Sequence, residues 1–409
     1  MRVRGTVLGA RGGLLEVSLP GARIGDGVSV RGARGVLHGT IGALLGSRAT
    51  VAPHGGLEGI TTGDAVHADP AAAMLPLGTT LLGRAFDARG HALDGGVPPT
   101  GRVVRVGGER ISPAERRPIA EPLWTGVRVI DGLLTIGRGA RIGLFGEAGV
   151  GKSRLLQALA RGTNADAVVV GLVGERGREA QAWTGACDPY GSVVCATGDR
   201  PAAERIWAAR VAMSQAHALR ARGLHVLAIL DSLARFGAAL REIAVASGES
   251  VGRGGYPPSV FAELAGLVEI AGCTARGSIT LIATVLSDGD ERDPLSDAAR
   301  SLLDGHVQLA PRLARAGHYP AVDVPASISR TMDAVVSAEH LAHARAVRRA
   351  LALLAQSEDA RSLGIAPADP ATQAAVSAEE ELETLLRQGP EPSSCAQTLA
   401  RLARVADTL

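Results

Sequence analysis

The spacing of apolar residues changes twice along this chain. Residues 1–68 contain short alternating stretches such as RVRGTV, LLEVSL, GVSVRG and ATVAP, separated by glycine and proline. Alternation of this kind is typical of strands that bury one face, so the segment predicts a small all-β barrel or sandwich. Residues 69–100 form a connecting region, in which LLGRAFDARGHALDGG predicts a strand and a turn.

Continuous apolar runs replace the alternation between about residues 100 and 330. Separated by segments of helix length, they predict strands of a buried parallel sheet. We expect strands at residues 141–145, 167–173, 225–230 and 278–286, and helices at 152–161, 202–222 and 232–246. From residue 331 the pattern is helical, with one apolar face formed by Leu341, Ala344, Val347, Leu351 and Leu354. The chain is therefore predicted to be an α/β protein with domains at 1–68, 69–330 and 331–409.

Composition narrows the class of protein. The 409 residues are 46% apolar but only 2% aromatic, so the core must consist of Ala, Val, Leu and Ile. A net charge of +2 does not favour a nucleic-acid binder. The charged first 20 residues do not resemble a signal peptide, and no apolar run reaches the length of a membrane span. We therefore expect a cytoplasmic protein, and any association with a membrane would be peripheral. The four cysteines are expected to be reduced and to serve in packing: Cys187, Cys195, Cys273 and Cys395.

The stretch GEAGVGKS fits the P-loop pattern G-x-x-x-x-G-K-[ST]. It follows an expected strand and opens an expected helix, which is the context that the motif requires. Main-chain N–H groups of such a loop surround phosphate oxygens, and the helix N-terminus adds positive partial charge. The predicted nucleotide-binding residues are Gly146, Glu147, Ala148, Gly149, Val150, Gly151, Lys152 and Ser153.

Lys152 is the only lysine among the 43 Lys and Arg residues. A codon bias towards arginine explains the scarcity elsewhere and makes the one retained lysine informative. An ammonium group is a compact point charge that can reach the β- and γ-phosphates, whereas a planar guanidinium is too large for the loop. Ser153 is expected to give an oxygen to Mg²⁺.

Two carboxylates follow expected strands of the same sheet. Glu175 ends the first apolar run after the P-loop, and Asp231 ends the next. Ligands of open α/β sheets lie at the carboxyl ends of strands. Glu175 is thus predicted to polarise the attacking water and Asp231 to hold Mg²⁺. The alternatives are a solvated turn for Glu175 and a helix cap for Asp231.

The segment GHYPAVDVPASISR contains Tyr319 and Arg330. Taken alone, these residues read as a packing tyrosine and a surface arginine. Together with five other stretches, however, the segment resembles the ATPases of type III secretion, in both their flagellar and injectisome forms. These stretches are RRPIAEPLWTGVRVIDGLLTIGRGARIGLFGEAGVGKS, VGERGRE, LAILDSLARFGAALREIA, GGYPPSVFAEL and DAARSLLDGHVQL. More distantly, the chain resembles the catalytic subunits of rotary ATP synthases.

The resemblance implies a β-barrel domain, a RecA-like ATPase core and a helical C-terminal domain, assembled as a homohexamer. It implies Glu175 as the catalytic glutamate, Asp231 as the Walker B residue and Tyr319 as the aromatic beside adenine. Arg330 looks like an arginine finger offered to a neighbouring subunit, and Arg176 would lie near the γ-phosphate. Many members have a longer N-terminal segment that contacts a stator, and the stretch at 353–370 is shorter here than in the family.

The expected function is Mg²⁺-dependent ATP hydrolysis that energises protein export, with stator, stalk, cargo and chaperones as partners at the inner-membrane export gate. A rotary ATP synthase subunit, a hexameric RNA or DNA translocase and a non-catalytic scaffold are the alternatives. A translocase barrel would need aromatic side chains for single strands, and residues 1–68 contain no Phe, Trp or Tyr.

Overall fold

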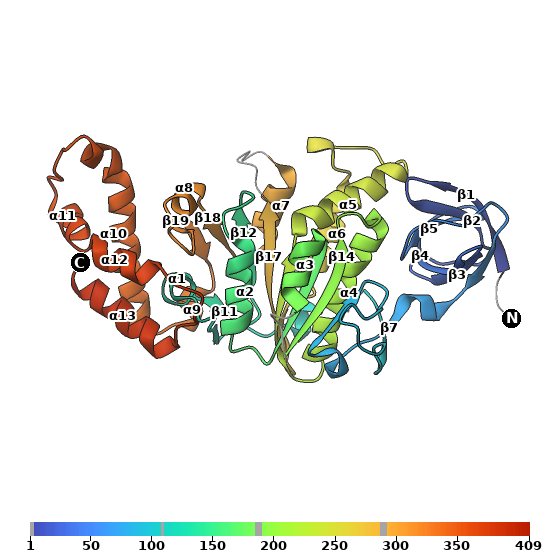
Figure 1. The fold of residues 1–409 in the computed structure, drawn as a ribbon, viewed down its shortest axis with the longest axis horizontal. Helices are drawn as coiled ribbons and strands as arrows, with labels where there is room; N and C mark the ends of the chain where they lie inside the picture. Colours follow the sequence, from blue (N-terminus) through green and yellow to red (C-terminus); the bar gives the residue numbers. More distant parts are fainter. Residues whose placement is uncertain (1–3, 108–109, 185–189, 287–292) are drawn as a thin grey trace.

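The computed structural model describes residues 4–107, 110–184, 190–286 and 293–409. The molecule is elongated, with a β-barrel at one end, a large sheet with helices in the middle, and C-terminal helices at the other end (Figure 1). The two termini therefore lie at opposite ends of the long axis.

The N-terminal segment is a closed barrel in which the strands follow the order β1-β2-β5-β4-β3-β6. The strands are β1 (Arg4–Arg11), β2 (Leu14–Ser18), β3 (Gly27–Gly32), β4 (Gly35–Leu45), β5 (Arg48–Pro53) and β6 (Ala65–Ala68). Its interior is aliphatic, since alternate residues such as Leu15, Val17, Val28 and Val30 are buried. Contacts between the barrel and the rest of the protein include His54, whose ring stacks on Trp207 at 3.7 Å between centroids, and the Gly25 carbonyl oxygen, which accepts a hydrogen bond from Arg105.

The central sheet has the order β19-β18-β12-β17-β15-β13-β14-β8. All neighbours pair in parallel except β19, which is antiparallel to β18. The strands are β8 (Arg84–Asp87), β12 (Arg141–Gly146), β13 (Ala167–Glu175), β14 (Gly191–Thr197), β15 (His225–Asp231), β17 (Ser278–Leu286), β18 (Gly305–Leu309) and β19 (Val322–Ser329). Each of the four apolar runs is thus a strand, and the strand expected in the connecting region joins the sheet as edge strand β8.

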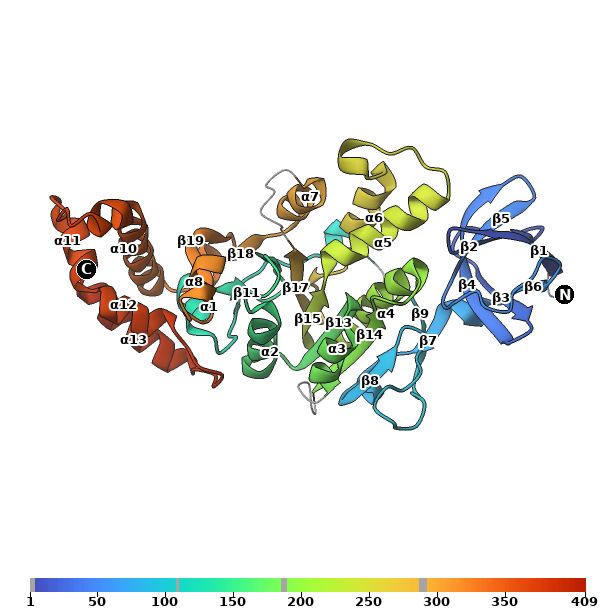
Figure 2. The same cartoon turned by 45° about the horizontal axis from the view of Figure 1, so that its top comes forward.

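Helices cover both faces of this sheet (Figure 2). The helices of this part are α1 (Arg128–Leu133), α2 (Lys152–Gly162), α3 (Gly177–Thr184), α4 (Ala202–Arg220), α5 (Leu233–Ala246), α6 (Pro258–Val268), α7 (Pro294–Leu302) and α8 (Pro311–Arg315). The central part also contains the short strands β7 (Met74–Pro76), β9 (Val103–Arg105), β10 (Pro122–Leu123), β11 (Ile136–Gly137) and β16 (Gly272–Cys273). Its 3₁₀ turns lie at Pro70–Ala73, Thr79–Leu81, Pro113–Glu115 and Arg253–Gly255.

The C-terminal part is helical, as the pattern predicts. It consists of α9 (Met332–Val335), α10 (Ala338–Ser362), α11 (Pro370–Ser377), α12 (Glu379–Leu386) and α13 (Cys395–Asp407). Its apolar residues do not form a separate core: Val347 and Leu382 belong to the same buried cluster as Ile142 and Leu156 of the sheet and α2. The predicted helix face lies on α10, where Ala344 and Val347 are buried.

Cys195, Cys273 and Cys395 are free thiols, as expected, and Cys187 lies outside the described residues. Among the described residues, no helix combines the length and the apolar composition that a membrane span requires.

Candidate active site

The P-loop connects the end of β12 to the start of α2. Gly149 and Gly151 have φ values of 84° and 94°, a region that side chains with a Cβ rarely adopt. A Cβ on Gly151 would also lie 3.2 Å from the Tyr319 ring. No side chain among the described residues caps α2. Its first N–H groups can therefore bind an anion, as a phosphate site requires.

The ammonium group of Lys152 lies inside this loop. Its Nζ donates to the main-chain carbonyl oxygens of Gly146, at 2.6 Å, and Glu147, at 3.1 Å. These two bonds direct the charge towards the concave side of the loop. This is the position from which a compact cation can contact terminal phosphates.

Glu175 and Asp231 end the neighbouring parallel strands β13 and β15, and both are about 95% buried, with exposed fractions of 4% and 5%. Asp231 Oδ1 accepts a 2.6 Å hydrogen bond from the Thr284 hydroxyl, which fixes its orientation. Burial is the main cause that raises the pKa of Glu175 to about 7, and repulsion from the Asp231 carboxylate is the second cause. Burial also raises the pKa of Asp231. The strand ends thus concentrate negative charge that a cation would relieve.

Arg235 was not identified from the sequence, although it contacts the predicted catalytic glutamate. Its Nη1 lies 3.0 Å from Glu175 Oε1 and also donates to the carbonyl oxygen of Gly174. The residue occupies the third position of α5, after the cap Ser232. A cation in the first turn of a helix opposes the helix dipole, so an arginine there indicates a nearby carboxylate or anion. The place of Arg235 in the first turn of the helix expected at residues 232–246 can be recognised from the sequence alone.

One cavity of about 510 Å³ gathers most of the predicted site residues. The P-loop contributes Ala148, Gly149, Gly151, Lys152 and Ser153, and the other predicted residues there are Glu175, Arg176, Asp231 and Tyr319. Of the remaining predicted residues, Gly146 and Glu147 hold Lys152, and Val150 lines an adjoining cavity. Arg154, Arg178, Glu179 and Arg235 are additional lining residues.

The residues present fit Mg²⁺. This ion prefers hard oxygen ligands and usually keeps only one or two protein carboxylates, with phosphates and water completing its shell. The Ser153 hydroxyl and the Asp231 carboxylate line the same cavity. Among the described residues, no group of three or more His, Cys, Asp or Glu forms a metal cage without a substrate. Ser153 and Asp231 would therefore hold the ion together with a nucleotide.

Arg330 lies at the end of the strands opposite the P-loop. It directly follows β19, whose last residue Ser329 pairs with Gly305, and Gly305 also pairs with Ile142 near the start of β12. From Ile142 to the P-loop the strand rises about 13 Å, at roughly 3.3 Å per residue. The Arg330 side chain is exposed and donates to the Leu303 carbonyl oxygen at 3.1 Å. The fold therefore separates Arg330 from the P-loop of its own chain.

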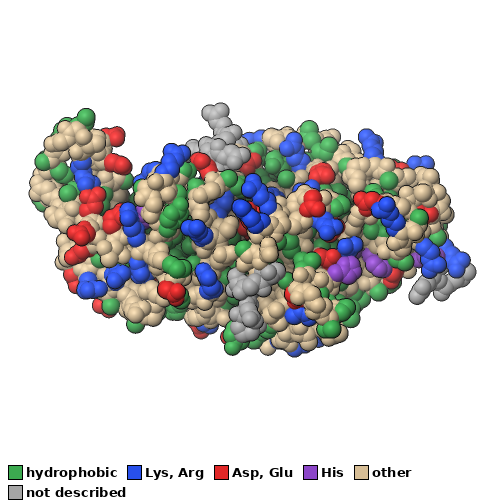
Figure 3. All heavy atoms as spheres, in the orientation of Figure 1, with side chains coloured by type: hydrophobic (Ala, Val, Ile, Leu, Met, Phe, Trp, Pro, Cys, Tyr) green, Lys and Arg blue, Asp and Glu red, His purple; other side chains and the backbone are tan. Residues whose placement is uncertain are grey.

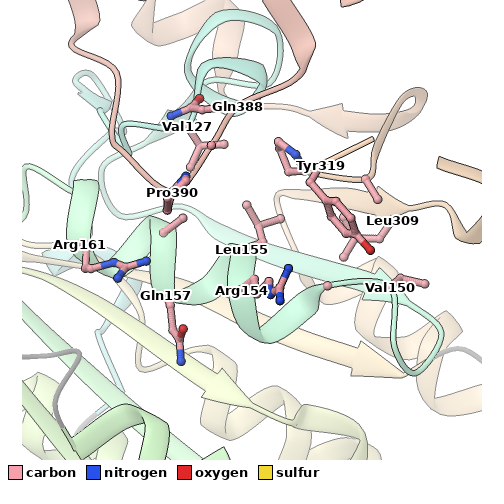
Figure 4. Close-up of a pocket in the computed structure, with 15 residues that line it drawn as sticks. Val127, Val150, Arg154, Leu155, Gln157, Arg161, Leu309, Tyr319, Gln388 and Pro390 are labelled. Atoms are coloured by element: carbon pink, nitrogen blue, oxygen red, sulfur yellow. The ribbon is translucent and has the colours of Figure 1, made fainter. Parts of the chain in front are cut away.

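A second cavity, of about 460 Å³ and mostly apolar, adjoins the first at Gly151, Arg154 and Tyr319 (Figure 4). In Figure 4, Tyr319 and Leu309 lie on one side of it, and Gln388 and Pro390 of the C-terminal part lie on the other. A flat apolar ring attached to phosphates at the P-loop could enter here beside Tyr319. No motif or periodicity in the sequence predicts that the segment after α12 forms this wall.

Lys152→Arg is expected to reduce ATP turnover at least about 100-fold although it keeps the positive charge. The larger guanidinium cannot make both carbonyl contacts inside the loop without displacing it. Steady-state ATPase measurements at saturating Mg²⁺ and ATP would test this, with Arg349→Lys, at an exposed position of α10 that lines neither cavity, as the reciprocal exchange. Near-normal turnover of Lys152→Arg would refute the steric explanation for the lone lysine.

Comparisons with known proteins agree with this geometry. Residues 126–329 match the nucleotide-binding domain of the ATP synthase alpha/beta family, and residues 336–404 match the C-terminal domain of the type III secretion ATPase EscN. The chain is 46% identical over 370 residues to the flagellum-specific ATP synthase of Pseudomonas aeruginosa, covering 88% of this chain and 82% of that protein. It is 40% identical over 426 residues to the type 3 secretion system ATPase of Pseudomonas syringae pv. tomato, covering 100% and 95%.

Among solved structures, the assembled ATPase EscN of the enteropathogenic E. coli type III secretion system is similar over 98% of this chain and 100% of its own. The TM-score is 0.91 at 35% sequence identity. EscN in complex with its central stalk EscO gives a TM-score of 0.88 at 34% identity, over 98% of this chain and 100% of that one. The chain therefore belongs to the ATPases of type III secretion and flagellar export, a branch of the ATP synthase alpha/beta family.

Proposed function

We propose that this chain hydrolyses Mg²⁺-ATP at the P-loop cavity and uses the energy to unfold export substrates or release them from chaperones. The observation that carries the proposal is that Lys152, Ser153, Glu175 and Asp231 line a single cavity beside Tyr319. Phosphoryl transfer depends mainly on positioning and on charge stabilisation, and these residues supply both.

Each residue has a distinct role in this proposal. Lys152 and the N–H groups of the P-loop bind the terminal phosphates, and Mg²⁺, when bound, neutralises part of their charge. Glu175 orients the attacking water and accepts its proton, for which a pKa near neutrality is suited. Arg235 keeps the Glu175 carboxylate in place through their ion pair. Arg330 of one subunit approaches the γ-phosphate in the next, with Arg176 in a supporting position.

The alternatives are less well supported. The match of residues 336–404 to the EscN C-terminal domain favours an export ATPase over a rotary ATP synthase subunit. Against a nucleic-acid translocase, basic and acidic side chains are interspersed along the face shown in Figure 3, from the helical end to the barrel. A non-catalytic scaffold would not need an acidic residue at position 175.

We further propose that the chain works as a homohexamer, divided at residues 68/69 and 330/331, at the cytoplasmic side of the inner membrane. EscN has been solved as an assembly and with its central stalk EscO. By this similarity a stalk protein would contact the ring formed by this chain. Stator proteins, cargo and chaperones are the further expected partners.

The ATPase rate as a function of protein concentration tests this proposal. If each site needs Arg330 from a neighbour, the rate per subunit should rise steeply as subunits associate. The measurement requires Mg²⁺ and ATP in excess, with Lys152→Ala as the inactive control. A Mg²⁺-dependent rate per subunit that stays constant from dilute monomer to assembled ring would contradict a shared site. Absence of ATP hydrolysis at every concentration would contradict the function itself.

A further inference from the structure

The segment that follows α12 is fixed to the nucleotide-binding part by a group of hydrogen bonds. The Arg128 guanidinium, at the start of α1, donates to the carbonyl oxygens of Leu385, at 3.1 Å, and Thr384, at 3.2 Å. It also donates to the carbonyl oxygen of Arg387. The chain after Leu386 is thereby held against the beginning of α1, next to the apolar cavity.

Gln388 occupies the centre of this contact and is half-buried. Its main-chain N–H donates to the carbonyl oxygen of Tyr319 at 2.9 Å. Its side-chain Oε1 accepts from the N–H of Arg128 at 2.8 Å. Its Nε2 donates to the carbonyl oxygens of Gly126, at 2.7 Å, and Glu391, at 2.8 Å. Both amide hydrogens and the amide oxygen are therefore used.

The main-chain bond to Tyr319 connects the two opposite walls of the apolar cavity, and the side-chain bonds to Arg128 and Gly126 fix the C-terminal wall to the start of α1. Tyr319 belongs to one wall, while Gln388, Gly389 and Pro390 belong to the other, as Figure 4 shows for the labelled residues. The phosphate cavity, in contrast, is lined by the P-loop and the strand ends and does not include Gln388. A change of the Gln388 side chain should therefore loosen the C-terminal wall that faces Tyr319 without altering the phosphate contacts.

We propose that Gln388 is a positioning residue for the nucleobase: it holds the C-terminal wall of the cavity at the distance from Tyr319 that a planar base requires. This inference rests on the proposed function, because it assumes that the phosphates of the same nucleotide lie at the P-loop. It assigns to the segment after α12 an indirect share in base affinity, through the position of the cavity wall. The Gln388 side chain acts through the main chain of residues 126, 128 and 391, and it need not touch the base.

Gln388→Met keeps the length of the side chain and removes its three side-chain hydrogen bonds. We expect the KM for ATP to rise about tenfold while kcat changes less than about twofold. Tripolyphosphate has the charges of ATP but no base. Its inhibition constant, measured as a competitive inhibitor, should remain within about twofold of the wild-type value. Gln388→Glu, which keeps the acceptor for Arg128 but loses the Nε2 donors, should also raise the KM for ATP selectively.

The matched control is Gln356→Met, because Gln356 is an exposed glutamine on α10 of the same C-terminal part. It should leave both constants unchanged. An unchanged ATP affinity in Gln388→Met and Gln388→Glu would overturn the inference. Equal weakening of ATP and tripolyphosphate would also overturn it, since that result indicates a general structural defect. If Gln388→Met fails to fold, Gln388→Glu decides alone.

Failure of this inference can be distinguished from failure of the proposed function. If the wild-type chain hydrolyses ATP and the Gln388 variants keep the wild-type ratio of ATP to tripolyphosphate affinity, only the inference fails. If the wild type does not hydrolyse ATP, the proposed function fails. In that case, the same ratio measured by calorimetry for Mg²⁺-ATP and Mg²⁺-tripolyphosphate binding still decides the role of Gln388.

Discussion

Replacing Arg330 with alanine is expected to lower the turnover number for ATP by about 10³- to 10⁵-fold, the range typical of an arginine finger. The residue follows edge strand β19 at the end of the strands opposite the P-loop, so it cannot reach phosphates bound at the P-loop of its own chain. ATP affinity should change little, because the residues that line the phosphate cavity remain in place. Turnover at saturating ATP and nucleotide binding by calorimetry give the two readouts.

A suitable control is Arg345→Ala. Arg345 is an arginine on α10 whose ion pair with Asp333 is exposed on both sides, and such pairs contribute little to stability. It should keep wild-type turnover. Wild-type turnover of Arg330→Ala would contradict the finger role. A comparable loss in Arg345→Ala would instead indicate that removing surface arginines disturbs assembly in general.

Glu175→Gln is expected to retain ATP affinity and to lose turnover by about 10²- to 10⁴-fold, the usual contribution of a general base. The amide has the shape of the carboxylate but cannot accept a proton from water. Turnover and ATP binding are measured separately. Wild-type turnover of Glu175→Gln would refute the catalytic role.

Mixing this variant with Arg330→Ala adds a sharper test, because neighbouring subunits of the two kinds can together form an intact site. Mixtures shown to co-assemble should recover some activity.

The pH profile checks the same residue independently. Burial and the charge of Asp231 raise the pKa of Glu175 to about 7, so below that pH the carboxyl group is protonated and cannot act as a base. For the wild type, kcat/KM should therefore rise between about pH 6 and pH 8, because it reports the free enzyme. The residual activity of Glu175→Gln should lack this rise. An identical rise in both proteins would assign the titration to another group.

Much of the fold could be predicted because its signals are local. Apolar runs at residues 167–173 and 225–230 identify strands directly, and the P-loop pattern marks the junction of β12 and α2. The rule that ligands lie at the carboxyl ends of strands then places Glu175 and Asp231 beside the P-loop, where they line the same cavity. Each of these inferences needs only a short window of sequence.

The missed features depend on contacts between distant segments. Strand β8 joins the sheet beside β14 although more than 100 residues separate them in sequence. Gln388 contacts Tyr319, which lies about 70 residues earlier in the chain, and the apolar residues of α10 complete a core begun by α2. Neither periodicity nor composition contains this information. Arg235 differs from these cases, since its unfavourable place in the first turn of α5 was visible from the sequence.

The opposed positions of the P-loop and Arg330 have a consequence for assembly. In the proposed shared site, each subunit offers one surface that receives an arginine and a different surface that provides one, so neighbours would associate head to tail. Such contacts close into a ring only if the rotation between neighbours divides a full turn. An open arc of n subunits then contains n−1 complete sites, with an unmatched surface at each end. The subunit that fills the last gap completes two sites at once.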